Sequence, residues 1–168
     1  MRFQKAEEHD LAAVRLLYKS AIGLDGCTWN EQYPGENELS DDFAAGCLFV
    51  LTAGNTVLGA VSVVPENELD DQGIWTVNDG TQREIARLAV APAFRGSGCA
   101  RYMLIQLFER LKAEGCHSVH ILAAKINKPA IRLYRSMGFS FLGECFLYGH
   151  HFFACEKILQ TQPGEVLP

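Results

Sequence analysis

Lysine and arginine are missing from a long stretch of this chain. Between Ser20 and Gln82 there are eleven aspartates and glutamates and no lysine or arginine. From Arg83 to Ile158 the balance reverses, with eleven basic and five acidic side chains. Solvated helices and loops account for part of this asymmetry. The remainder predicts a bipolar site, in which the second half of the chain holds an anion and the first half a cation.

Long apolar runs are also missing. The longest, residues 43–53, is interrupted and far short of the roughly 20 residues that a membrane-spanning helix needs. The first ten residues carry acids where a signal peptide has an apolar core. We therefore expect a cytoplasmic protein with no membrane partner. A length of 168 residues, 48% of them hydrophobic, suits one folded domain, which we place at 1–160 with a loose tail at 161–168.

Metal-ligand and nucleic-acid patterns are absent as well. The six cysteines are scattered, and no two have CxxC spacing. His117 and His120 fall three residues apart in an expected strand, which points them to opposite faces. We therefore expect no bound metal. The net charge of −5, without a dense basic run, argues against a nucleic-acid partner.

Hydrophobic periodicity predicts strands that alternate with helices. Strands are expected at residues 2–6, 47–53, 56–65, 84–90, 118–124, 139–149 and 151–159. Helices are expected at residues 10–22, 37–45, 99–114 and 127–137. Strands alternating with helices after a hairpin predict a mixed α/β sheet.

One glycine-rich turn directly precedes the N-terminus of the third expected helix, in "APAFRGSGCARYMLIQL". Unpaired N–H groups and the helix dipole make such a position an anion site. A P-loop is excluded because no lysine follows Gly98, and a dinucleotide loop fits poorly because Arg101 takes the place of its third glycine. The remaining pattern, [QR]-x-x-G-x-[GA], is filled by residues 95–100. An ordinary turn before a helix is the alternative.

This loop, the strand before it, the helix after it and "INKPAIRLYRSMGF" together resemble the GNAT superfamily of acetyl-CoA-dependent N-acetyltransferases. The resemblance covers most of the chain and is strongest from Glu84 to Gly138. It implies an α/β (α+β) fold with a mixed, mostly antiparallel sheet of six to seven strands and about four helices. It also implies direct transfer of an acetyl group from acetyl-CoA to a small-molecule or peptide amine, by a monomer or homodimer.

The resemblance implies which residues bind acetyl-CoA. The pyrophosphate would lie on the loop formed by Arg95, Gly96, Ser97, Gly98, Cys99 and Ala100. The pantetheine arm would lie along the main chain of Leu88, Ala89 and Val90. Asn127 matches a CoA-contacting asparagine of the family, and it can equally cap the helix that follows. Direct transfer needs no nucleophile, so Cys99 is expected to pack beside the loop.

Catalytic and acceptor-binding residues follow from the same resemblance. Glu84 is the candidate base, with an ion pair to Arg83 or Arg87 as the alternative. Tyr134 is the candidate acid, with simple packing between helix and sheet as the alternative. Trp29, Tyr33 and Trp75 lie in loops expected to border the acceptor, and the first two can instead cover the core. Aromatic rings among acidic residues suit a cationic acceptor. A catalytically weak acyl-CoA-binding module is the rival function.

Overall fold

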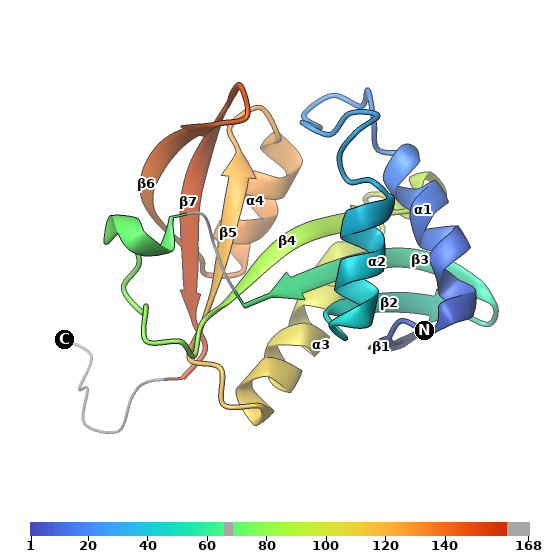
Figure 1. Cartoon of the computed structure of the whole chain (residues 1–168), viewed down its shortest axis with the longest axis horizontal. Coiled ribbons are helices and arrows are strands. Elements are labelled where there is room, and N and C mark those ends of the chain that lie inside the picture. The colour runs from blue at the N-terminus through green and yellow to red at the C-terminus, as the bar shows by residue number, and fades with distance from the viewer. Residues whose placement is uncertain (66–68, 161–168) are drawn as a thin grey trace. The chain divides into compact units, whose positions relative to one another are not determined.

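The computed structural model describes residues 1–65 and 69–160 (Figure 1). Two acids of the long acidic stretch, Glu66 and Glu68, and the expected tail at 161–168 lie outside the described residues. The described chain contains four α-helices and seven strands, in the sheet order β1-β2-β3-β4-β5-β7-β6. The pairs β1–β2, β2–β3, β5–β7 and β6–β7 are antiparallel, and β4–β5 is parallel. The predicted mixed, mostly antiparallel fold is therefore confirmed.

The chain divides into two compact units, residues 1–64 with 85–106 and residues 65–84 with those from 107 on. The single domain expected at 1–160 stays a prediction. Among the described residues, no helix has both the length and the apolar character needed to cross a bilayer.

The first unit is a sheet covered by helices on both faces. It contains β1 (Arg2–Lys5), α1 (Leu11–Lys19), α2 (Glu36–Ala44), β2 (Leu48–Ala53), β3 (Thr56–Val64), most of β4 (Arg83–Val90) and the first half of α3 (Cys99–Ala113). Helices α1 and α2 lie on one face, and the start of α3 lies on the other (Figure 1).

Strand alternation explains the two faces of this unit. Ala89 of β4 packs with Val14 and Leu17 of α1, whereas Leu88 and Val90 pack against the cluster that contains Met103 of α3. Successive side chains of a strand point to opposite faces, so one strand serves both layers. The apolar spacing that predicted α1 is the spacing of a helix with one buried side.

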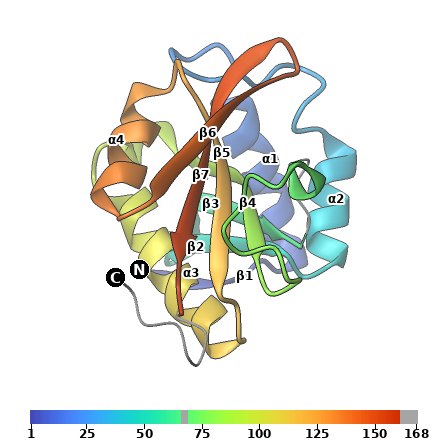
Figure 2. The same cartoon turned by 90° about the vertical axis from the view of Figure 1, so that its left-hand side faces the viewer.

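The second unit is built on β5 (Ser118–Ala124), β6 (Ser140–Leu147) and β7 (His150–Ile158), with α4 (Lys128–Ser136), the second half of α3 and the first two residues of β4. β7 pairs with both β5 and β6. Helix α4 and the loop with the short helix η2 (Asp70–Gln72) lie on opposite sides of these strands (Figure 2). The loop side buries Leu69 and Trp75 with Ala154.

Candidate active site

The glycine loop joins the end of β4 to the start of α3. Gly96 has φ +77° and Gly98 has φ +88°, backbone conformations that side chains with a Cβ rarely adopt. A Cβ placed on either glycine would have no other atom within 4 Å, so both glycines border open space. Helix α3 begins at Cys99 directly after the loop. Its first N–H groups have no partner within the helix, so this turn presents backbone donors to an anion.

Three side chains of the predicted phosphate loop have structural partners. The Arg95 guanidinium donates from Nε to the carbonyl of Val90 at 3.0 Å and from Nη2 to the carbonyl of Ser20 at 3.3 Å. The Ser97 hydroxyl donates to the carbonyl of Phe94 at 2.5 Å. Cys99 is buried against the Met103 cluster, as the sequence predicted. These contacts hold the loop in shape, so its backbone is the part left to meet a ligand.

Part of the loop backbone is engaged as well. The N–H groups of Arg95 and Ser97 donate to the carbonyls of Pro92 and Phe94, at 3.4 Å and 3.3 Å. The sequence assigned the whole run of amides from Arg95 to Ala100 to phosphate binding. Two of these N–H groups are already donated within the turn, so they are not available to a ligand in this structure.

Arg87 of β4 is held by a buried ion pair. Its Nε and Nη2 donate to the two carboxylate oxygens of Asp42 on α2, at 2.8 Å and 2.6 Å, and its Nη1 donates to the Tyr33 hydroxyl at 3.0 Å. Burial alone lowers the pKa of Arg87, but Asp42 and Tyr33 outweigh it and raise the pKa above its ordinary value. These bonds hold the Arg87 guanidinium against the Asp42 carboxylate.

The predicted acceptor aromatics of the first unit have different surroundings. Trp29 packs against the core and meets Tyr18 edge to face, with ring centroids 5.4 Å apart. Tyr33 is 38% exposed and lies beside the Arg87 guanidinium. Trp29 therefore covers the core, which was the alternative to an acceptor-binding role. Tyr33 exposes part of its ring to solvent.

Glu84, the candidate base, is half-buried near the start of β4. It is the register partner of His120 in the parallel ladder between β4 and β5. The side chains of two residues paired across adjacent strands project to the same face of the sheet. Glu84 and His120 therefore lie on one face of the second unit. The sequence missed this proximity because the two residues are linked only by strand register.

Tyr134, the candidate acid, is 7% exposed on α4. Its ring packs against Phe139 with centroids 5.5 Å apart. Burial raises the pKa of the Tyr134 phenol well above its ordinary value. A phenol that keeps its proton at neutral pH can donate that proton to a developing anion. Packing between helix and sheet, the alternative reading of this residue, is present too.

Asn127 caps α4. Its side-chain oxygen accepts a hydrogen bond from the N–H of Ala130 at 3.1 Å. This is the capping role that the sequence allowed, and it fixes the side chain at the helix N-terminus.

Trp75 was expected to border the acceptor pocket, but its side chain is buried. It is 7% exposed and stacks on His120, with ring centroids 4.0 Å apart and ring planes 14° apart. His120 is in turn bonded to Glu156 on β7. Nothing in the local sequence around these three residues signals the cluster, because its members come from a loop and two strands far apart in the chain.

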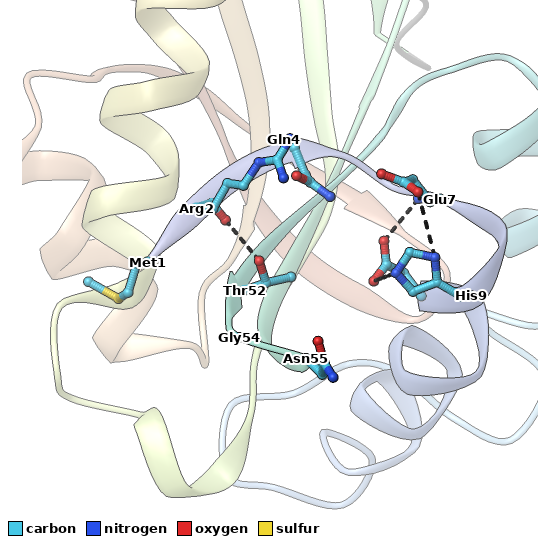
Figure 3. Close-up of a pocket in the computed structure, with 9 residues that line it drawn as sticks. Met1, Arg2, Gln4, Glu7, His9, Thr52, Gly54 and Asn55 are labelled. Carbon is cyan, nitrogen blue, oxygen red and sulfur yellow. Dashed lines mark hydrogen bonds and ion pairs between the residues drawn. The ribbon is translucent and has the colours of Figure 1, made fainter.

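A cavity of about 450 Å³ lies elsewhere, against β1 and the β2–β3 turn (Figure 3). Its polar side chains are partly occupied with one another: His9 lies 3.6 Å from carboxylate oxygens of both Glu7 and Asp10. None of the predicted site residues lines it. Within residues 1–65 and 69–160, no group of three or more histidine, cysteine or acidic residues is placed to hold a metal ion.

The arrangement of these elements is that of known acetyltransferases. A GNAT-family acetyltransferase of Streptococcus agalactiae superposes with a TM-score of 0.82 at 22% identity, over 95% of this chain and 96% of that one. yncA of Salmonella typhimurium, solved with its cofactor acetyl-CoA, superposes with a TM-score of 0.75 at 22% identity, over 99% and 98% of the two chains. At these identities the likeness establishes the fold.

Sequence comparison establishes the family. The acetyltransferase (GNAT) family matches residues 12–139, more than half of the chain. N-acetyltransferase 8F1 of Rattus norvegicus is 27% identical over 104 residues, which are 62% of this chain and 44% of the rat protein. The match thus spans less than half the length of that relative. The chain belongs to the acetyltransferase (GNAT) family, as its glycine loop suggested.

Proposed function

We propose that this chain is an N-acetyltransferase that moves an acetyl group from acetyl-CoA to a primary amine, by direct attack while both are bound. The observation that carries the proposal is the glycine loop. Two left-handed glycines border open space immediately before a 15-residue helix, in a chain of the acetyltransferase (GNAT) family.

The loop fits the pyrophosphate of acetyl-CoA. A side chain at Gly96 or Gly98 would enter the space in front of the helix, so the two glycines keep room for a ligand next to the backbone. The N–H groups of Cys99 and Ala100 begin α3 and suit phosphate oxygens. The main chain of Leu88, Ala89 and Val90, in the same unit as the loop, completes the proposed acetyl-CoA site. The assignment of Asn127 to acetyl-CoA stays a prediction of the sequence.

The chemistry divides between a base and an acid. Acetyl-CoA supplies the thioester whose carbonyl carbon the amine attacks. Glu84 removes a proton from the acceptor ammonium, either directly or through one water. The main-chain N–H near Leu88 donates to the carbonyl oxygen as negative charge develops there. As the carbon–sulfur bond breaks, the Tyr134 hydroxyl donates its proton to the leaving sulfur. The nitrogen sheds its second proton as the amide forms, and that proton restores the Tyr134 hydroxyl.

The acceptor is proposed to be a cationic small molecule or peptide amine. The acidic stretch supports this, although some of its described members have basic partners from outside the stretch: Asp42 is paired with Arg87 and Glu36 with Arg15, and Asp79 lies 3.7 Å from His117. Asp25, Glu31 and Asp41 are exposed. Comparing spermidine and a lysine-rich peptide with glutamate tests the class, and kcat/KM for a cation should fall as salt screens the field. Faster acetylation of glutamate would contradict a cationic acceptor.

Thiol release from acetyl-CoA on addition of a pooled amine panel tests the enzymatic function. We expect amine-dependent release that is absent without protein. The rival function, an acyl-CoA-binding module, predicts binding of acetyl-CoA without amine-dependent release. A cytoplasmic location and a monomeric or homodimeric state remain predictions of the sequence.

A further inference from the structure

A buried histidine lies beside the candidate base. His120 on β5 is 0% exposed. Its Nε2 lies 3.1 Å from Oε1 of Glu156 on β7 and 3.3 Å from the Ser118 hydroxyl. Trp75 stacks on the imidazole ring. A titratable ring this deep in the second unit is costly unless its polar atoms are used.

Glu156 sets the protonation of the ring. The carboxylate is 2% exposed and accepts N–H bonds from Thr76 at 3.2 Å and Val77 at 2.9 Å. Burial raises the pKa of Glu156, but the hydrogen bonds from His120, Thr76 and Val77 outweigh it and leave the pKa below its ordinary value. An ionised carboxylate accepts only, so the facing Nε2 must carry a proton and donate.

The contacts described so far give no role to the second ring nitrogen of His120, Nδ1. Nδ1 of His120 is buried, and within the described part of the chain it has no hydrogen-bond partner. In a neutral ring whose Nε2 carries the proton, Nδ1 is a basic lone pair. A buried acceptor without a donor needs an explanation, and a role in proton transfer is one of the recognised ones.

The register places this base next to Glu84. Glu84 on β4 and Glu156 on β7 are the register partners of His120 on its two sides. Glu84 and Glu156 are the titratable groups that face the ring from these neighbouring strands, and Trp75 covers it from the loop. All of these residues belong to the second unit. A carboxylate that orients an imidazole, leaving its other nitrogen basic, is the arrangement of a proton acceptor.

We propose that His120, oriented by Glu156, is the second member of a proton relay with Glu84. This inference rests on the proposed acetyl transfer. The proton that leaves the acceptor ammonium passes to Glu84 and then, across one water, to Nδ1 of His120. The amine nitrogen keeps its electron pair and attacks the thioester carbonyl. The ring becomes an imidazolium paired with Glu156, and it releases its proton to solvent after product leaves.

The kinetic test uses His120→Gln. The glutamine amide can still donate to Glu156, as Nε2 does, but it cannot take up a proton. We expect kcat/KM for the amine to fall by about 10- to 100-fold, within the range of proton-transfer effects, while KM for acetyl-CoA is unchanged. The pH profile of the variant should lose the ascending limb due to the relay. His117→Gln, the same replacement at a histidine beside Asp79 and outside the proposed site, is the control and should keep that limb.

The outcomes separate the two proposals. Wild-type protein without amine-dependent thiol release overturns the proposed function. An active wild type, together with a folded His120→Gln variant of equal kcat/KM and the same pH profile, overturns the relay alone. A variant that loses activity in proportion to its folded fraction, measured by thermal unfolding, also overturns it, because the histidine would then be structural.

A spectroscopic test needs neither activity nor a variant at the site. Long-range nitrogen–proton correlation spectra of protein labelled on its five histidines report the tautomer of each ring. Replacing the other histidines one at a time assigns His120. We expect Nε2 to carry the proton and Nδ1 to be unprotonated in the resting protein. An Nδ1-protonated tautomer, or a doubly protonated ring, would overturn the relay.

Discussion

Arg87 and Asp42 form a two-bond ion pair that links β4 to α2 inside the first unit, with Arg87 8% exposed and Asp42 4% exposed. For Glu84, an ion pair with Arg83 or Arg87 was the alternative to a catalytic role, and it stays a prediction. The pair of Arg87 with Asp42 occupies one acid of the stretch that lacks basic residues. β4 contains both Arg87 and the residues proposed to contact acetyl-CoA. The ion pair therefore holds in place the strand on which the proposed site depends.

Removing Asp42 should destabilise the protein strongly. Asp42→Ala leaves the buried guanidinium bonded to the Tyr33 hydroxyl without its carboxylate, and breaking a buried pair from one side costs about 3–5 kcal/mol. Asp41→Ala, on the same helix but exposed, is the matched control and should change stability by less than about 0.5 kcal/mol. Urea unfolding measures both variants, and equal losses would contradict the structural role of the pair.

Removing the Tyr134 hydroxyl should slow the chemical step. Tyr134→Phe keeps the ring packing against Phe139 and removes the proposed proton donor. We expect kcat to fall by about 10- to 1000-fold while acetyl-CoA still binds. Tyr18→Phe, at a buried tyrosine of the first unit, serves as the control and should leave kcat near the wild-type value. An unchanged kcat in Tyr134→Phe would leave this tyrosine with packing alone.

Stability should fall in alkaline solution. Burial raises the pKa of Tyr18 to about 12, despite an opposing hydrogen bond with Ser62, and it raises that of Tyr134 further. Tyrosines of the unfolded chain lose their protons near pH 10, whereas these two keep theirs when folded. Stability is therefore intact below about pH 10. Above that pH it declines by up to about 1.4 kcal/mol per pH unit for each tyrosine.

Tyr18→Phe isolates the contribution of one tyrosine to this decline. Its free energy of unfolding should fall less than that of wild type between about pH 9 and pH 11, the interval that spans the ordinary tyrosine pKa. Tyr148→Phe is the control, because Tyr148 is 74% exposed and its removal should leave the alkaline decline unchanged. Identical declines in wild type and Tyr18→Phe would contradict a contribution of the buried Tyr18 hydroxyl to the alkaline loss of stability.

The sequence predicted those features that depend on neighbours along the chain. Alternating apolar residues located β4, and Asn127 before Pro129 located the start of α4. The paired glycines before α3 located the tight turn at the start of that helix, because left-handed backbone favours glycine.

Features that depend on strand register were beyond the sequence. Insertion of β7 between β5 and β6 brings Glu156 next to His120 across 36 residues of chain. Only the folded sheet reveals that contact, or the stacking of Trp75 on the same ring. The acceptor role assigned to Trp75 rested on its loop position, which says nothing of burial. Asp42 and Arg87, 45 residues apart, illustrate the same limit.

The central claim is that the glycine loop binds the pyrophosphate of CoA, and calorimetric titration of CoA into Gly98→Glu tests it most directly. The matched control is Gly115→Glu, because Gly115 has φ +81° against +88° for Gly98, and both sites border open space. Each variant carries the same added charge and a similar backbone strain. We expect CoA binding to be lost in Gly98→Glu and retained in Gly115→Glu, with both variants folded. Near-normal CoA affinity in a folded Gly98→Glu variant would contradict it.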